Sequence, residues 1–314
     1  MLPDFVDALG DGVYAIDTGF VRTRFDAAYL IVDRGRAAFV DTGTNHSVPR
    51  LLAALRALEL DVDAVDWVIP THVHLDHAGG AGLLMRSLPQ ARMAVHPRGR
   101  RHMVDPSALV AGATAVYGKE AMARSYGVPV GVDAARTVAT ADGMTLTLGT
   151  RVLEFIDTPG HARHHHCIWD ARTRTWFTGD TFGLGYPELV NGRGHWVTPT
   201  SAPVQFDPEP LKASVARLLA RAPAALCVTH FGRVPNAPHL GPLLASQIDE
   251  MAALGERLRR ADDRHARLCD AMRAMYMHRL AEHGFADLDA ALALLADDVE
   301  INAQGLEAWL DRTA

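Results

Sequence analysis

Residues 71–80 read THVHLDHAGG, and this stretch decides the fold class. Within it, His72, His74, Asp76 and His77 form the pattern His-x-His-x-Asp-His. With 16 histidines among 314 residues, such a pattern arises by chance in roughly three of a thousand chains of this length. On a helix, His72 and His74 would point about 200° apart, whereas in extended backbone they share a face. The pattern therefore predicts a metal-binding loop.

Other candidate ligands also follow strand-like runs. The run VDWVIPT precedes the histidine pattern and predicts a strand, and the small residues Ala78-Gly79-Gly80 predict a tight turn into the next helix. Three further runs end at His161, Asp180 and His230, and an earlier one ends at Asp41. Functional groups at successive strand ends of an α/β protein converge on one edge. The set supplies enough ligands for two divalent ions, and imidazole and carboxylate without thiolate suit Zn, Fe, Mn, Co or Ni.

The patterning predicts a mixed domain followed by a helical region. Up to about residue 235, short apolar runs end at Gly, Thr, Pro or charged residues, as strands do. Helical spacing occurs in Val48–Leu58 and in Pro208–Leu219, where Asp207 is a candidate N-cap. Strands mixed with helices indicate an α/β or α+β domain. Residues 96–126, between two strand runs, predict a helical insertion.

The C-terminal part has a different pattern. From His239 onward no strand pattern is present, and amphipathic helices are predicted for Leu243–Leu258, Ala266–Leu280, Leu288–Leu295 and Ala303–Leu310. We therefore divide the chain into a domain that carries the candidate ligands, residues 1–238, and a helical extension, residues 239–314. The amphipathic faces predict that the extension mediates self-association into a homo-oligomer or covers the rim of the active site.

Composition excludes several classes of partner. The net charge of −6 falls entirely after residue 240, and the 29 arginines and 2 lysines are dispersed, which disfavours nucleic acid. No apolar run reaches the roughly 18 residues of a membrane span, and the N-terminus lacks a secretory signal. Three scattered cysteines disfavour a disulfide framework. We expect a cytoplasmic protein without membrane or nucleic-acid partners.

The ordered ligand set resembles the metallo-β-lactamase superfamily, whose five motifs are all present across roughly residues 10 to 235. The resemblance implies an αββα sandwich with two divalent ions, zinc first and iron or manganese next, at one edge between its sheets. One ion would bind His72, His74 and His161, and the other Asp76, His77 and His230, with Asp180 bridging them. Asp41 would orient a ligand histidine. His165 occupies a position where glyoxalase II-like members also carry histidine, and we assign it a supporting role beside the ligands.

The reaction class that follows is metal-assisted hydrolysis. Two divalent ions can generate a bridging hydroxide at neutral pH for attack on a carbonyl, with Asp76 orienting the water and moving its proton. Glyoxalase II-like thioesterases and lactonases share the Asp-His-Ala-Gly-Gly pattern, so an activated acyl bond, thioester or lactone, in a small molecule is the expected target. Two alternatives remain. One is a persulfide dioxygenase of the same fold, with one iron on His72, His161 and Asp180, and the other is a non-catalytic metal-binding scaffold.

Five further residues are candidates for substrate binding. Four aromatic side chains in loops after the ligand strands predict an apolar rim. Arg233, three residues after His230, is a candidate anchor for a substrate carboxylate. The four aromatic residues are Phe182, Tyr186, Trp196 and Phe231.

Overall fold

The structure, a computed structural model, describes residues 1–202, 204–235 and 237–314. Its contacts divide the chain into two compact units. The first unit comprises Met1–Asp157, His164–Gly179 and Ala224–Arg233, and the second comprises Thr158–Arg163, Asp180–Pro223 and Val234–Ala314. The second unit therefore holds the whole of the predicted 239–314 extension together with segments from earlier in the chain.

The first sheet has seven strands that follow the order of the chain. The strands from β1 to β4 pair in antiparallel fashion, and those from β4 to β7 pair in parallel. They are β1 (Val6–Gly10), β2 (Val13–Asp17), β3 (Ala27–Asp33), β4 (Arg36–Val40), β5 (Val65–Ile69), β6 (Arg92–Val95) and β7 (Thr137–Ala139).

The second sheet has six strands in the order β15-β14-β11-β10-β9-β8. From β8 to β11 neighbours are antiparallel, and β11 pairs with β14 in parallel. The strands are β8 (Thr145–Leu148), β9 (Arg151–Asp157), β10 (His166–Asp170), β11 (Thr175–Gly179), β14 (Ala225–Val228) and β15 (Gly232–Pro235).

Strand β3 shows how the sequence builds two cores at once. Its residues alternate, so that Leu30 belongs to a core on one face of the first sheet and Tyr29 and Ile31 to a core on the other. The second of these cores also contains Phe155 and Phe177 of the second sheet. The two sheets thus pack face to face, which accounts for strands that are apolar on both sides.

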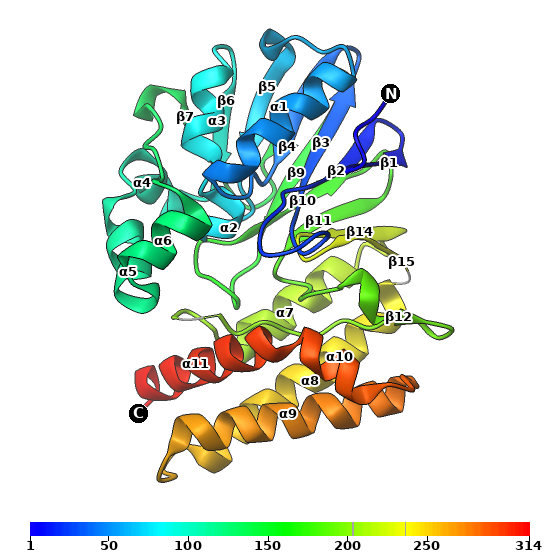
Figure 1. Ribbon diagram of the computed structural model, residues 1–314. Helices are drawn as coiled ribbons and strands as arrows, with labels where there is room; N and C mark the ends of the chain where they lie inside the picture. The colour runs from blue at the N-terminus through cyan, green and yellow to red at the C-terminus, as the bar shows by residue number, and fades with distance from the viewer. Residues whose placement is uncertain (203, 236) are drawn as a thin grey trace. The chain divides into compact units, whose positions relative to one another are not determined.

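Helices cover the outer face of the first sheet (Figure 1). Leu51 and Leu55 of α1 and Leu84 of α3 pack into the core on that face. The predicted helix over residues 48–58 and the predicted helical insertion are confirmed. The helices of this unit are α1 (Val48–Ala57), α2 (Leu75–Ala78), α3 (Ala81–Ser87), α4 (Pro97–Val104), α5 (Ser107–Tyr117) and α6 (Lys119–Tyr126).

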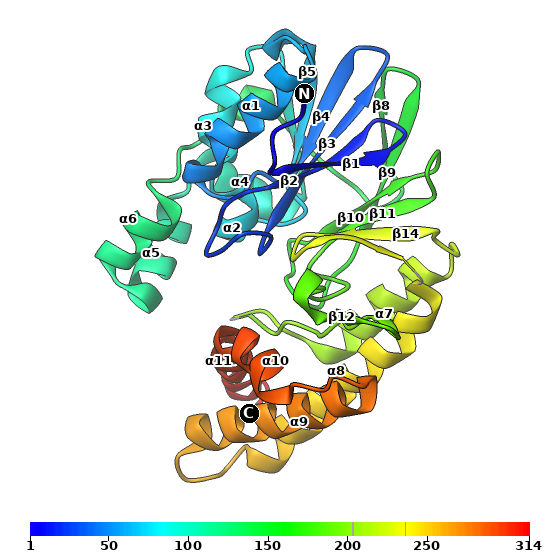
Figure 2. The same cartoon turned by 45° about the vertical axis from the view of Figure 1, so that its right-hand side comes forward.

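The predicted helical C-terminal extension is confirmed and belongs to the second unit, where α8 and α9 lie side by side (Figure 2). Leu268, Met272 and Tyr276 of α9 are buried, so its apolar face packs within the unit. Self-association through these helices stays a prediction. The elements are β12 (Val190–Asn191), β13 (Gly194–His195), α7 (Pro208–Leu219), α8 (Ala237–Leu258), α9 (Arg264–His283), α10 (Leu288–Leu294) and α11 (Ala296–Arg312).

Among the described residues, no helix combines the length and the apolar character that a membrane crossing requires.

Candidate metal centre

The histidine loop leaves the first sheet after β5, as predicted. His74 has extended backbone, with φ of −64° and ψ of 151°, and caps the short helix α2. Asp76 and His77 follow within that helical turn, so one short segment presents four candidate ligands in two backbone conformations. His72 Nε2 lies 2.9 Å from His74 Nδ1, which places the two donor nitrogens on the same side of the loop.

Gly80 is required for a reason that the sequence pattern did not indicate. Its backbone is helical, with φ of −81°, so no left-handed turn calls for glycine. A Cβ atom at this position would instead lie 2.5 Å from the carbonyl oxygen of Thr44, far inside contact distance. The Gly80 amide also donates to the Gly43 carbonyl at 2.8 Å. The glycine lets the end of the metal loop approach the loop after β4.

Asp76, His77 and His230 form a complete three-residue ligand group within the first unit. Their donor atoms all lie within 4.8 Å of one another. Asp76 Oδ2 is 3.7 Å from His77 Nε2 and 3.6 Å from His230 Nε2. The Asp76 side chain is 24% exposed, whereas both histidines are buried. An oxygen between two imidazole nitrogens, open to solvent on one side, suits a divalent transition-metal ion.

Protein acceptors fix which nitrogen each ligand histidine offers. His230 Nδ1 lies 3.2 Å from the Phe25 carbonyl oxygen, which can only accept, so His230 donates Nδ1–H there. Its Nε2 then carries a lone pair towards Asp76 and a metal. His77 Nδ1 lies 3.0 Å from Asp41 Oδ2, with the same consequence for its Nε2. Partners of this kind set the tautomer of metal-binding histidines. The residues therefore fit a metal.

Asp41 joins three loops around this group. Its carboxylate is buried, and Oδ1 accepts from the Thr71 amide at 2.7 Å. Thr71 Oγ1 lies 3.0 Å from both carboxylate oxygens, and Thr229 Oγ1 donates to Oδ2 at 2.9 Å. Asp41 thus holds the loops after β4, β5 and β14 together while it orients His77. This is the contact that the predicted role requires.

His165 and His166 support the loop from the second sheet. The buried His165 ring stacks on His72, with 4.8 Å between ring centroids. His166 Nε2 donates to the Pro70 carbonyl at 2.9 Å, and burial lowers the pKa of this imidazole to about 3. A neutral His166 therefore anchors the residue that precedes the metal loop. His165 contacts a candidate ligand directly, and its supporting role in catalysis stays a prediction.

His161 and Asp180 belong to the second unit, where they lie close together. His161 Nε2 is 3.4 Å from Asp180 Oδ2. His161 Nδ1 lies 3.2 Å from the Thr200 carbonyl oxygen, so this histidine also donates from Nδ1 and keeps Nε2 for a metal. Along the chain, Asp180 directly follows β11, and His161 lies four residues beyond the end of β9.

The predicted substrate residues are mostly buried. Phe182, Tyr186 and Trp196 lie in the second unit, where Tyr186 donates to Asp298 at 3.3 Å and Trp196 packs edge-on against Tyr276. In the first unit, Phe231 belongs to the core between the sheets, and Arg233 Nη1 donates to the Leu9 carbonyl at 3.0 Å. Their role in substrate binding stays a prediction.

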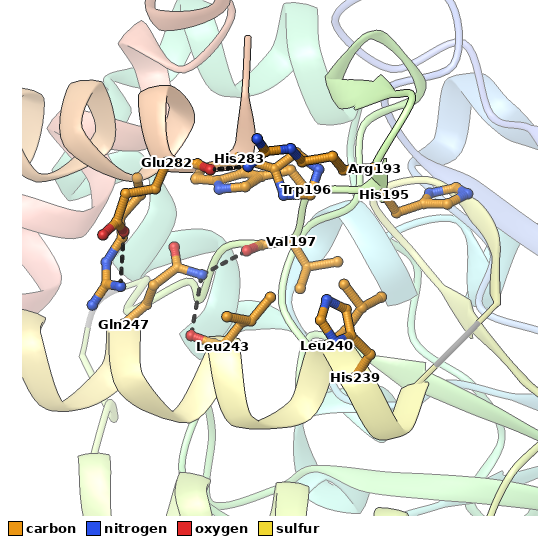
Figure 3. A pocket seen from close by; sticks show the side chains of 11 residues that line it. Arg193, His195, Trp196, Val197, His239, Leu240, Leu243, Gln247, Glu282 and His283 are labelled. Atoms are coloured by element: carbon orange, nitrogen blue, oxygen red, sulfur yellow. Dashed lines mark hydrogen bonds and ion pairs between the residues drawn. The ribbon is translucent and has the colours of Figure 1, made fainter.

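Trp196 also lines a pocket of about 320 Å³ that lies within the second unit (Figure 3). Several polar groups around it already bond to each other or to backbone. Gln247 Nε2 donates to the Val197 carbonyl at 2.8 Å, and Arg193 Nη1 donates to the Glu282 carbonyl at 2.6 Å. His283 Nε2 donates to the Gly194 carbonyl at 3.2 Å. These bonds join the β12–β13 hairpin to α9 and the segment that follows the hairpin to α8.

Two residues near the ligands were missed from the sequence. Asp26 is fully buried, and burial raises the pKa of its carboxyl group well above its ordinary value. Its Oδ2 accepts from Thr18 Oγ1 at 2.9 Å. Phe25, beside it, supplies the carbonyl that orients His230. An aspartate directly after an aromatic residue, just before a strand, is the only sequence signal, and it is a weak one.

Known proteins are similar to this chain over a region that includes the candidate ligands. A family model described as the metallo-beta-lactamase superfamily matches residues 21–230. The hydroxyacylglutathione hydrolase of Acidiphilium cryptum is 30% identical over 292 residues, which cover 87% of this chain and 96% of the relative. A solved structure of a metallo-beta-lactamase superfamily protein from Sulfolobus tokodaii has a TM-score of 0.67 at 21% identity, covering 95% of this chain and 98% of that one. A metallo-beta-lactamase family protein from Thermus thermophilus has a TM-score of 0.64 at 19% identity, covering 98% and 95%.

Proposed function

Because this chain belongs to the metallo-β-lactamase superfamily, we propose that it is a metal-dependent hydrolase that cleaves an activated acyl bond, a thioester or a lactone, in a small molecule. The observation that carries the proposal is the ligand group Asp76, His77 and His230, in which both histidines are held by Nδ1 so that Nε2 faces the aspartate. Such a group is built to bind a metal, and its three residues come from two loops that Asp41 joins.

The full centre in this proposal holds two ions, with zinc as the first expectation. His72 and His74 contribute to one site and Asp76, His77 and His230 to the other. We propose that His161 and Asp180, whose side chains lie 3.4 Å apart, complete the centre, with Asp180 shared between the ions. When bound, divalent ions at such a centre lower the pKa of a coordinated water towards neutrality and polarise a carbonyl oxygen.

The side chains of this chain supply positioning and proton transfer. Asp76 is the solvent-accessible member of its group, so its second oxygen, Oδ1, is placed to orient the attacking water and accept a proton from it. Asp41 keeps His77 in one tautomer and one orientation, and the stacked ring of His165 limits the rotation of His72. Each contact reduces the reorganisation needed when substrate arrives.

The acyl preference rests on relatives and on charge. A relative covering most of this chain is named as a hydrolase of hydroxyacylglutathione. The basic residues are dispersed and the net charge is −6, which gives a polyanionic nucleic acid no basic groove to follow. Small acyl compounds do not require such a groove.

The test is a panel of substrates on metal-loaded protein, with an acyl thioester, a homoserine-type lactone, a β-lactam and a bis-aryl phosphodiester. We expect kcat/KM to be highest for the thioester or the lactone. Asp76→Asn should lower it at least about 100-fold, because the substitution removes both a charged metal ligand and the proposed general base. Asp63→Asn, an exposed aspartate of the same unit, is the matched control and should retain full activity.

Phosphodiester turnover above both acyl classes would contradict the acyl assignment. A single iron per chain, with oxygen uptake in the presence of a persulfide, would replace the hydrolase by a dioxygenase of the same fold. If the protein binds its full complement of metal but shows no turnover in either assay, the result would support the non-catalytic metal-binding scaffold.

A further inference from the structure

A second group of metal-type ligands lies in the helical part of the second unit. His265 and Cys269 are one helical turn apart on α9, and Glu300 approaches them from α11. Residues four apart on a helix share one face, so the pairing follows from the sequence spacing. Apart from groups built from the candidate centre above, this is the one such cluster of His, Cys, Asp or Glu among the described residues.

The three donor atoms have the separations of one face of a zinc tetrahedron. His265 Nε2 lies 3.6 Å from Cys269 Sγ and 3.3 Å from Glu300 Oε2, and Cys269 Sγ lies 3.6 Å from the same oxygen. A tetrahedral zinc ion, with bonds of about 2.3 Å to sulfur and about 2.1 Å to nitrogen and oxygen, separates such donors by about 3.3–3.6 Å. All three edges agree with that geometry.

The surroundings of the cluster orient each donor. His265 Nδ1 lies 2.9 Å from Glu307 Oε2, the carboxylate–histidine contact that fixes the metal-binding nitrogen. Glu300 Oε1 accepts from Gln304 Nε2 at 2.8 Å and also lies 3.1 Å from His265 Nε2, so both carboxylate oxygens face the cluster. Glu307 is itself held by Arg264 at 3.2 Å. The same arrangement of supporting contacts surrounds ligands in metal sites generally.

We propose that His265, Cys269 and Glu300 bind a zinc ion that links α9 to α11, with a fourth position left for water. Thiolate, imidazole and carboxylate together favour zinc over calcium or magnesium, which prefer oxygen ligands alone. The ion would tie the last helix of the chain to the longer helix beside it. Its role is structural, and it does not depend on the hydrolase proposed above.

The alternative is that the same atoms form only hydrogen bonds and ion pairs. His265 contacts both Glu300 and Glu307, and the Cys269 thiol donates to Glu300 Oε2. Burial, with Glu300 nearby, raises the pKa of this thiol, so zinc must displace its proton. A protonated thiol and a metal-bound thiolate differ in their spectra, and this difference provides the test.

Cobalt substitution distinguishes a metal site from a cluster held by hydrogen bonds and ion pairs alone, because only a thiolate ligand gives a sulfur-to-cobalt charge-transfer band in the near ultraviolet. The candidate centre above has histidine and aspartate ligands alone, so the band reports on Cys269. The full-length protein is loaded with Co²⁺, and its zinc-loaded form is measured by elemental analysis. We expect the band in wild type and its loss in Cys269→Ser, together with a loss of about one zinc equivalent per chain. Activity on the substrate panel should be unchanged.

Two control variants show whether loss of the band is specific to the cluster. His278→Ala, at an exposed position of α9, and Cys167→Ala, at a buried thiol elsewhere, should both keep the band. Glu300→Gln preserves the shape of the side chain and should weaken cobalt binding at least about tenfold, because a charged ligand is lost. Absence of the band in wild type, or its persistence in Cys269→Ser with equal zinc content, would overturn the proposal.

Discussion

Asp41 Oδ2 lies 3.0 Å from His77 Nδ1, and both side chains are buried. The pair connects the end of β4 to a metal-ligand candidate on the loop after β5, so a carboxylate outside the proposed ligand set fixes the direction of a ligand nitrogen. Asp41 also has left-handed backbone, with φ of +57°, a conformation that Asp and Asn tolerate better than other residues with a side chain.

Asp41→Asn is the sharpest variant for this contact, because it keeps the size of the side chain and its tolerance of the left-handed backbone. We expect metal affinity at the centre to fall about 10–100-fold, since the carboxylate no longer fixes the His77 tautomer. Competition with a chromophoric chelator measures the affinity. Asp63→Asn should match wild type, and an equal affinity in both variants would contradict the positioning role.

Asp180→Ala tests the proposed bridge. Removal of a ligand shared by two ions should abolish detectable hydrolysis and lower the metal content by at least one ion of the proposed pair. Elemental analysis and the substrate panel check this together. Retention of both the full metal content and the rate would show that Asp180 does not bridge.

Gly80→Ala and Gly112→Ala form a matched pair. At Gly80 a Cβ atom would meet the Thr44 carbonyl oxygen at 2.5 Å, so we expect a loss of about 1–3 kcal/mol in the free energy of unfolding. At Gly112, inside α5, a Cβ meets nothing within 4 Å, and alanine should stabilise by about 0.5–1 kcal/mol. Urea unfolding of the metal-free proteins measures both, and equal effects would refute the steric argument.

The lowered pKa of buried His166 predicts a loss of folding stability in mild acid. The pKa of His166 is about 3 in the folded protein and has its ordinary value of 6.5 in the unfolded chain, so between these pH values the unfolded chain binds a proton that the folded protein does not. Stability is therefore unaffected above about pH 6.5 and falls below it, until the pH reaches the folded pKa. Between pH 6 and pH 5, wild type should lose about 1 kcal/mol more than His166→Gln in urea unfolding.

The control for this prediction is His278→Gln, which changes a histidine that is 65% exposed. It should follow the wild-type dependence on pH. If His166→Gln shows the same slope as wild type, the imidazole is not buried as a neutral group.

The sequence indicated the candidate ligands, but it did not indicate the groups that orient them. Two histidines separated by one residue share a face only in extended backbone, so the spacing of His72 and His74 predicted that conformation. The structure has extended backbone at His74. By contrast, the groups that orient His230 and His161 are backbone carbonyls of Phe25 and Thr200. Every residue type carries a carbonyl, so no side-chain pattern marks these positions.

Secondary structure followed the same division. The helices at residues 48–58 and 208–219 were predictable from local apolar spacing. Strands β1 and β15 were missed, because β1 has only one buried residue and ends in glycine, and β15 is short and contains proline. Asp207 occupies the N-cap position of α7 as predicted, but its side chain makes no capping hydrogen bond.

The hydrogen bond from the Thr71 amide to Asp41 Oδ1 makes one backbone proton a reporter on the whole centre. This amide can exchange with solvent only when the loop after β5 separates from the carboxylate that also holds His77 and Thr229. A metal bound by His77 opposes that separation. The exchange rate of the Thr71 amide should therefore fall as the centre fills with metal.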